Sequence, residues 1–158
     1  MRRFTLLTLP LALALLPTSL AAQSAADPQV QLWEAAMAGD TAAIRAAVEA
    51  GADVDSLDTR TARNGRRALN WAALNDHPSA IRVLLSLGAD LEATNITGFT
   101  ALNHAAEAGA PGATRALLDA GADPHHANNA GYKPVDTARE NAHFHVMEML
   151  AAAIKDEE

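Results

Sequence analysis

The sequence contains no cysteine in its 158 residues. Disulfide bonds, thiolate chemistry and lipid attachment through an N-terminal cysteine are therefore excluded. Aromatic residues are scarce, at 4% of the chain, although 49% of the residues are hydrophobic. A core with so few rings must consist mainly of alanine and leucine, which favours helices that lie close together. This amount of apolar material is enough for one modest domain and excludes a disordered chain.

The N-terminus has the order of a secretory signal peptide. It reads MRRFTLLTLPLALALLPTSLAAQS, with two arginines before an apolar run that is too short and too interrupted by proline to span a bilayer stably. Small residues follow, and we expect cleavage after Ala21 or Ala22. Residues 1–22 would then be removed, and the mature protein would be periplasmic or secreted. The alternative is an uncleaved N-terminal anchor.

Acidic side chains outnumber basic ones in this chain. The formal net charge is -7, and it becomes -9 once Arg2 and Arg3 leave with the signal peptide. An acidic protein repels phosphate backbones, so nucleic acid is not an expected partner. We also expect no membrane partner after signal cleavage, and we expect the mature protein to be a monomer.

A short glycine signature recurs through the rest of the chain, as GADVD, GADLE and GADPH. The last two copies lie 33 residues apart, and a second series of glycines, at Gly65, Gly98 and Gly131, advances by the same step. Pairs of alanines and pairs of leucines follow the same period. Such a period indicates a solenoid of stacked units.

One unit, residues 95–127, reads NITGFTALNHAAEAGAPGATRALLDAGADPHHA. Gly98 permits a turn with positive φ, and Thr100 can cap the helix that follows. Pro111 suits the first turn of a second helix, which Gly121 ends in the left-handed conformation. Each unit is thus predicted to be a helix, a turn and a helix, followed by a hairpin-like loop. Its apolar stripe can be buried only against the next unit.

This unit resembles the ankyrin repeat, whose pattern is roughly D-x-x-G-x-T-P-L-H-x-A-A-x-x-G-x-x-x-x-V-x-x-L-L-x-x-G-A-D. The resemblance extends over about residues 29–153. It implies an all-α fold, an ankyrin-repeat solenoid of four helix-turn-helix units joined by β-hairpin-like loops. We expect a linker at residues 23–28, units at residues 29–61, 62–94, 95–127 and 128–155, and an acidic tail at residues 156–158.

Two kinds of substitution depart from the family pattern. The histidine of that pattern is Asn70, Asn103 or Asp136 here, and each can still hydrogen-bond to the neighbouring loop. Its threonine is Arg67 in the second unit and Lys133 in the fourth. We expect those two helix starts to lose a capping hydroxyl, which costs roughly 1 kcal/mol each unless another group substitutes.

No residue pattern in the chain predicts catalysis. No serine lies in a G-x-S-x-G elbow, and the aspartates of the GAD signatures are explained as loop-forming residues. A repeat solenoid also offers an extended concave face rather than a closed pocket. We therefore expect no enzyme activity, no catalytic residues and no cofactor.

The histidines are the remaining candidates for chemistry, because imidazole is a common metal ligand. His125 and His126 follow a GAD turn, whereas His143 and His145 are two residues apart and face different sides of the last predicted helix. We expect no metal site and interpret these side chains as solvated or capping. A histidine-based metal-binding protein is the alternative.

Binding of a protein partner is the function that the resemblance implies. Partners of ankyrin-like repeats typically contact the loop tips and the exposed end of each first helix. The tips that precede the first helices are Arg66, Phe99 and Tyr132, and arginine and aromatic residues are common interface anchors. The alternative is that both aromatic residues simply cover their own loops. The matching helical positions are Met37, Ala38, Leu74, Asn75, Glu107, Ala108, Glu140 and Asn141.

The stretch TRTARNGRR, residues 59–67, carries four arginines: Arg60, Arg63, Arg66 and Arg67. From the signature glycine to the next turn glycine the distance is 14 residues here and 10 in later units. The first loop between units is therefore predicted to be longer by four residues. We interpret it as a binding finger for the acidic surface of a partner, because loops tolerate insertions and carry function. The alternative is a solvated insertion whose charges offset neighbouring acids.

Two roles for the bound partner stay open. Resemblance to small exported bacterial ankyrin proteins implies support or protection of a partner enzyme, such as a catalase. An inhibitor or immunity-type regulator of an enzyme would use the same surface.

Overall fold

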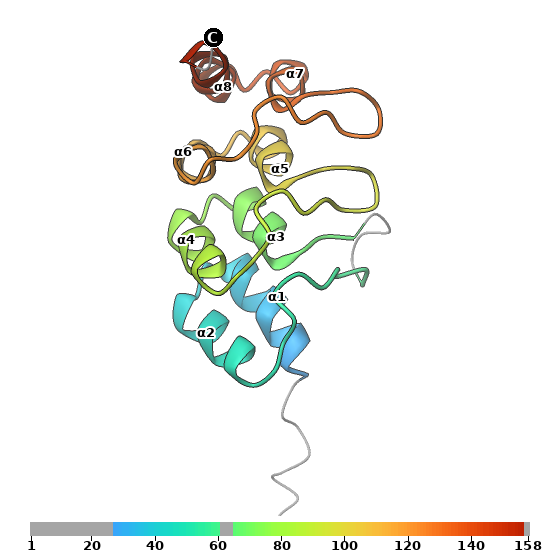
Figure 1. Ribbon diagram of the computed structural model, residues 1–158, viewed down its shortest axis with the longest axis vertical. Helices are drawn as coiled ribbons and strands as arrows, with labels where there is room; N and C mark the ends of the chain where they lie inside the picture. Colours follow the sequence, from blue (N-terminus) through green and yellow to red (C-terminus); the bar gives the residue numbers. More distant parts are fainter. Residues whose placement is uncertain (1–26, 61–64, 157–158) are drawn as a thin grey trace, which may run out of the picture.

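The computed structural model describes residues 27–60 and 65–156. These residues form eight α-helices in four stacked pairs (Figure 1), which confirms the predicted all-helical solenoid of four units. The predicted signal peptide and most of the predicted linker and tail lie outside the described residues. The pairs are α1 Pro28–Ala38 with α2 Thr41–Glu49, α3 Ala68–Leu74 with α4 Pro78–Ser86, α5 Ala101–Ala108 with α6 Pro111–Asp119, and α7 Pro134–Glu140 with α8 Phe144–Asp156.

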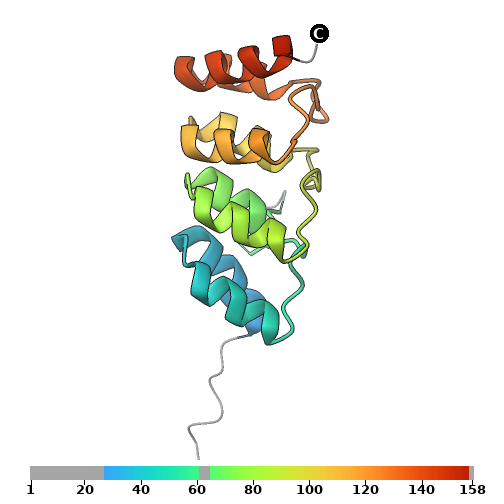
Figure 2. The ribbon, with the colours of Figure 1, turned by 60° about the vertical axis from the view of Figure 1, so that its left-hand side comes forward.

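The helices form two layers. The first helices of the units (α1, α3, α5 and α7) make one column and the second helices (α2, α4, α6 and α8) make the other (Figure 1). In Figure 1 the loops between units project to the right of the first helices, on the side away from the second helices; Figure 2 shows the second helices from the front. No helix in the described part of the chain is long and apolar enough to cross a membrane.

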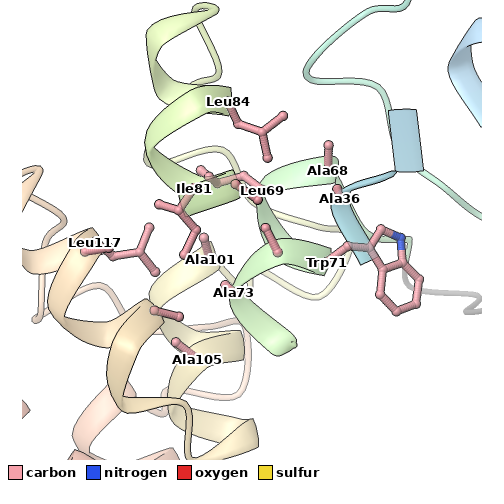
Figure 3. Packing of buried hydrophobic residues seen from close by; sticks show 14 of the residues in the cluster. Ala36, Ala68, Leu69, Trp71, Ala73, Ile81, Leu84, Ala101, Ala105 and Leu117 are labelled. Carbon is pink, nitrogen blue, oxygen red and sulfur yellow. The ribbon is translucent and has the colours of Figure 1, made fainter. Parts of the chain in front are cut away.

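Alanine and leucine fill the core, as their abundance predicted. Small residues on the first helices, such as Ala73 and Ala105, are completely buried, so neighbouring units approach closely. Larger side chains from the second helices reach between these alanine faces (Figure 3). Each buried leucine or isoleucine contributes roughly 1.5–3 kcal/mol through the area that it removes from water. The largest of these side chains are Leu32, Ile44, Ile81, Leu84, Leu102, Leu117 and Leu150.

The third unit has the helix ends that its sequence predicted. Thr100 Oγ1 accepts a hydrogen bond from Asn103 N at 3.3 Å, and Asn103 Oδ1 accepts one from Thr100 N at 3.0 Å. Helix α6 starts at Pro111, and Gly121 follows it with a φ of 88°. Capping by side chains at one end and a left-handed glycine at the other therefore set the length of the unit.

The second and fourth units lack a capping hydroxyl, as expected from Arg67 and Lys133. Part of the cap remains, because Asn70 Oδ1 accepts from Arg67 N at 2.8 Å and Asp136 Oδ2 accepts from Lys133 N at 3.3 Å. These side chains therefore bond to the last loop residue before their own helix.

Each first helix is followed by one residue with positive φ. This residue is Gly39 (72°) after α1, Asp76 (55°) after α3, Gly109 (65°) after α5 and Ala142 (58°) after α7. Glycine adopts this conformation without cost, whereas an alanine is strained by about 1–2 kcal/mol. The fourth unit therefore carries strain that the first and third avoid.

Substitution of this alanine should relieve the strain. We expect Ala142→Gly to raise the free energy of unfolding by about 1 kcal/mol, measured by urea denaturation. The control is Ala152→Gly at an exposed position inside α8, which should lower it by about 1 kcal/mol. Equal losses in both variants would contradict the proposed strain at residue 142.

Candidate partner-binding surface

The three loops between units are closed at equivalent positions beside the first helices, the first by two backbone hydrogen bonds and each later loop by one. These hydrogen bonds are 2.7 to 3.1 Å long. The first loop encloses residues 59–65, where the later loops enclose residues 96–98 and 129–131, so the predicted insertion of four residues is confirmed. All of it lies inside the closed loop and leaves the register of the helices unchanged. The closing pairs are Asp58 with Arg66, Asn95 with Phe99, and Asn128 with Tyr132.

Asp58 stands at the base of the first loop, where the other loops have asparagine. Its side chain is completely buried and accepts hydrogen bonds from Arg60 Nε at 2.9 Å and Arg60 Nη2 at 3.1 Å. Burial raises the pKa of Asp58, but the hydrogen bonds and the charge of Arg60 outweigh it, with a smaller contribution from Trp71. The pKa of Asp58 therefore lies below its usual value, and the carboxylate is ionised at neutral pH.

Arg60 attaches the first loop to α1. Its guanidinium carbon lies 4.9 Å from the centroid of the Trp33 ring, and Nη1 lies 3.8 Å from Glu34 Oε1. Trp33 is held in turn, because its indole nitrogen donates to Ser56 O at 3.2 Å. This part of the predicted binding finger therefore lies against the first unit.

Arg66 lies on the second unit in a similar way. Its guanidinium carbon is 4.7 Å from the centroid of the Trp71 ring, and that ring is buried. The Nε atom of Arg66 is buried and has no hydrogen-bond partner among the described residues. The two arginines thus cover tryptophans on successive first helices.

Arg67 has an internal role that the sequence did not reveal. Its guanidinium donates to Thr94 O from Nε at 3.3 Å and from Nη2 at 3.1 Å, and it donates from Nη1 to Asp55 O. These bonds join the segments that enter the second and third units. Partner binding by this arginine stays a prediction, as it does for Arg63, which lies outside the described residues.

The later loops carry apolar side chains, but Phe99 and Tyr132 lie at the closing positions at the base of their loops and not at the tips where they were expected. Tyr132 is 41% exposed, whereas Phe99 is partly buried against His104, with 5.3 Å between the ring centroids. Ile96 was not predicted as a contact residue, although it is 58% exposed. Its signal in the sequence is a β-branched residue at a loop tip. Asn129 Nδ2 donates to Ile96 O at 3.2 Å, so the second and third loops are direct neighbours.

The predicted helical positions lie in a row at the ends of the successive first helices. Glu107 is the member of this row with a perturbed pKa. The hydrogen bond that joins it to His104 Nδ1, at 3.0 Å, is the main cause that lowers this pKa; burial opposes it, and the charge of Arg66 adds a smaller decrease. Met37, Leu74 and Glu107 are half-buried, and Ala38, Asn75, Ala108, Glu140 and Asn141 are exposed.

Two histidines join neighbouring units. His77 Nε2 lies 3.0 Å from Met37 O, and His143 Nε2 lies 3.0 Å from Glu107 O, so each ring nitrogen can donate to the preceding unit. His143 thus caps α5 of the preceding unit and is only partly solvated. In the part of the chain that the structure describes, no three acidic or histidine side chains are grouped to hold a metal ion.

These features define a helical repeat protein whose loops and helix ends are open to solvent. Comparison with protein families finds ankyrin repeats, in three copies, over residues 32–128. The chain belongs to the ankyrin-repeat family, whose repeats form protein-protein interaction modules and are generally non-catalytic. A comparison with curated proteins finds no match for the chain.

Proposed function

We propose that this chain is an exported, non-catalytic protein that binds a protein partner through its loop tips and the concave face of its first helices. The observation that carries the proposal is the exposure of Ile96 and Tyr132 on adjacent loops. Export is supported by the signal-like N-terminal sequence.

The two exposed side chains contribute little to the fold itself. At 58% and 41% exposure, Ile96 and Tyr132 leave much of their apolar surface in water. Apolar and aromatic side chains held on well-ordered loops are favourable anchors, because few rotatable bonds must be fixed when they bind. A partner that covers them gains free energy without any rearrangement of the solenoid.

Binding is tested with the mature chain as bait in a periplasmic extract of its host. A captured protein must then bind the purified bait directly, and the double variant Ile96→Ser, Tyr132→Ser should weaken this binding at least tenfold. The matched control is Arg45→Ser, Arg82→Ser, which changes two exposed residues on the second helices. Equal loss in both variants, or no direct binder at all, would contradict the proposal.

The change that the chain causes in the activity of its partner separates the two open roles, protection and inhibition. If the partner is an enzyme, added mature chain should increase its activity or lifetime when the chain supports or protects it. A decrease would indicate an inhibitor or immunity-type regulator instead. Export is tested separately, by the N-terminal residue of the periplasmic product, which we expect to be Ala22 or Gln23.

A further inference from the structure

The two arginines that cover tryptophans differ in how their charge is balanced. Arg60 forms a two-point ion pair with the buried Asp58 and approaches Glu34. Arg66 has no ion pair with any carboxylate in residues 27–60 and 65–156. Among the described residues of a chain of net charge -7, Arg66 is therefore a cation without a paired carboxylate, although its charge acts on Glu107.

Arg66 is also held in a fixed position. Its backbone exchanges hydrogen bonds of 2.7 and 3.1 Å with Asp58, and its guanidinium carbon lies 4.7 Å from the centroid of the Trp71 ring, within the range of a cation-π contact. Since Nε is buried, the two terminal nitrogens are the donors left for another molecule. They form one edge of the planar guanidinium, and two parallel bonds from such an edge match the two oxygens of a carboxylate.

We infer that Arg66, fixed on Trp71, is the docking site for the carboxylate of an aspartate or glutamate side chain on the protein partner. This inference rests on the proposed function and names the chemistry of the partner at the second unit. Because the guanidinium is already ordered, binding costs less conformational entropy than for a free arginine. Along the surface, Arg66 is followed at equivalent positions by Phe99 and Tyr132, so the acidic contact has apolar contacts on one side.

Glu107 is the acidic neighbour that opposes this contact. Its carboxylate is hydrogen-bonded to His104 Nδ1 at 3.0 Å and does not pair with Arg66. A partner carboxylate at Arg66 would still be repelled by this charge. The site therefore makes two opposite predictions: Arg66→Gln removes the attraction, and Glu107→Gln removes a repulsion.

The first test needs no partner. Side-chain Nε–Hε signals of the arginines are followed by NMR in the ¹⁵N-labelled mature chain while N-acetylglutamate methylamide is added. The neutral control is N-acetylglutamine methylamide, and the internal control residues are Arg45, Arg82 and Arg115, which are exposed on α2, α4 and α6. We expect a saturable shift of the Arg66 signal with the glutamate probe alone. A shift no larger than that of Arg82, or an equal shift with glutamine, would overturn the inference.

The second test uses the partner identified by direct binding. Arg66→Gln should raise its Kd at least tenfold, Arg66→Lys should restore the affinity only in part, Glu107→Gln should lower the Kd, and Arg82→Gln should leave it unchanged. Thermal unfolding of each variant checks that the fold is retained. A partner that binds wild type and Arg66→Gln equally overturns the inference and leaves the proposed function standing. A saturable probe shift without any protein partner would show that Arg66 binds a carboxylate but would contradict the proposed function.

Discussion

Replacing Gly98 with alanine should destabilise the protein by about 3 kcal/mol, whereas the same change at Gly131 should cost only about 1 kcal/mol. Both glycines precede the closing residue of their loop, with φ angles of 79° and 86°. An alanine would be strained equally at the two sites. What differs is the surroundings of the added methyl group.

At residue 98 this methyl group would meet the next loop. Its carbon would lie 2.5 Å from Asn129 Oδ1 and 2.8 Å from Asn129 N, and the backbone of that residue is fixed by a bond from its N to Thr97 O at 3.1 Å. At residue 131, in the last unit, no described atom outside the adjoining residues lies within 4 Å of the added carbon. Urea denaturation of both variants measures the difference. Similar losses at the two sites would show that the loops do not pack as tightly as the distances indicate.

Replacing Arg60 with methionine should lower the free energy of unfolding by about 2 kcal/mol at pH 7. The variant leaves the carboxylate of Asp58 completely buried with no cation beside it. This loss is smaller than the usual cost of a broken buried ion pair because the Arg60 side chain is 39% exposed, and water can replace part of its contribution.

This loss should shrink in acid. In the wild type the pKa of Asp58 is lowered, so its ionised form contributes stability above the pKa of the unfolded chain, near 3.9, and that stability is lost as the pH falls through the folded value. Without the guanidinium of Arg60, burial is opposed only by the backbone N–H of residue 60 and by Trp71, so we expect the pKa of Asp58 to rise and protonation to relieve the variant first. Unfolding measured at pH 7 and at pH 3 should therefore show a smaller difference between the two proteins at pH 3.

The neutral asparagine of the later loops indicates how the stability lost in the Arg60→Met variant can be restored. Asn95 closes its loop with a neutral side chain, whose Oδ1 accepts from Thr97 N at 3.0 Å and Phe99 N at 2.9 Å. Adding Asp58→Asn to the Arg60→Met variant should therefore recover at least half of the lost stability. No recovery would mean that Arg60 stabilises the loop mainly through its contact with Trp33.

The period of 33 residues was enough to predict the fold. It placed Gly98, Thr100 and Gly121 at positions where backbone geometry leaves few choices of residue, and the structure confirms each. The same period could have singled out Asp58, because the equivalent residues Asn95 and Asn128 are amides and the exception stands beside four arginines. Repetition therefore reveals backbone roles, and breaks in the repetition reveal local chemistry.

The contacts of long side chains could not be predicted in this way. A repeat fixes where the side chains of Arg66 and Arg67 begin, but these long, flexible side chains can reach several neighbours. In the structure, Arg66 lies over the Trp71 ring, whereas Arg67 donates to two backbone carbonyl groups. The bond between His77 and Met37 joins residues 40 apart in sequence. Such contacts depend on how tightly the units stack, which in turn depends on the small alanine residues between them.

The closure of the first loop has a practical consequence for protein engineering. Its ends, Asp58 and Arg66, are joined by two backbone hydrogen bonds. The positions of the flanking helices therefore do not depend on the number of residues between Asp58 and Arg66. Loop length adds only slowly to the entropy of closure, by about 0.6 kcal/mol for each doubling. A foreign peptide, such as an epitope tag or a fluorophore attachment sequence, could therefore be grafted between these two residues while the solenoid keeps its register.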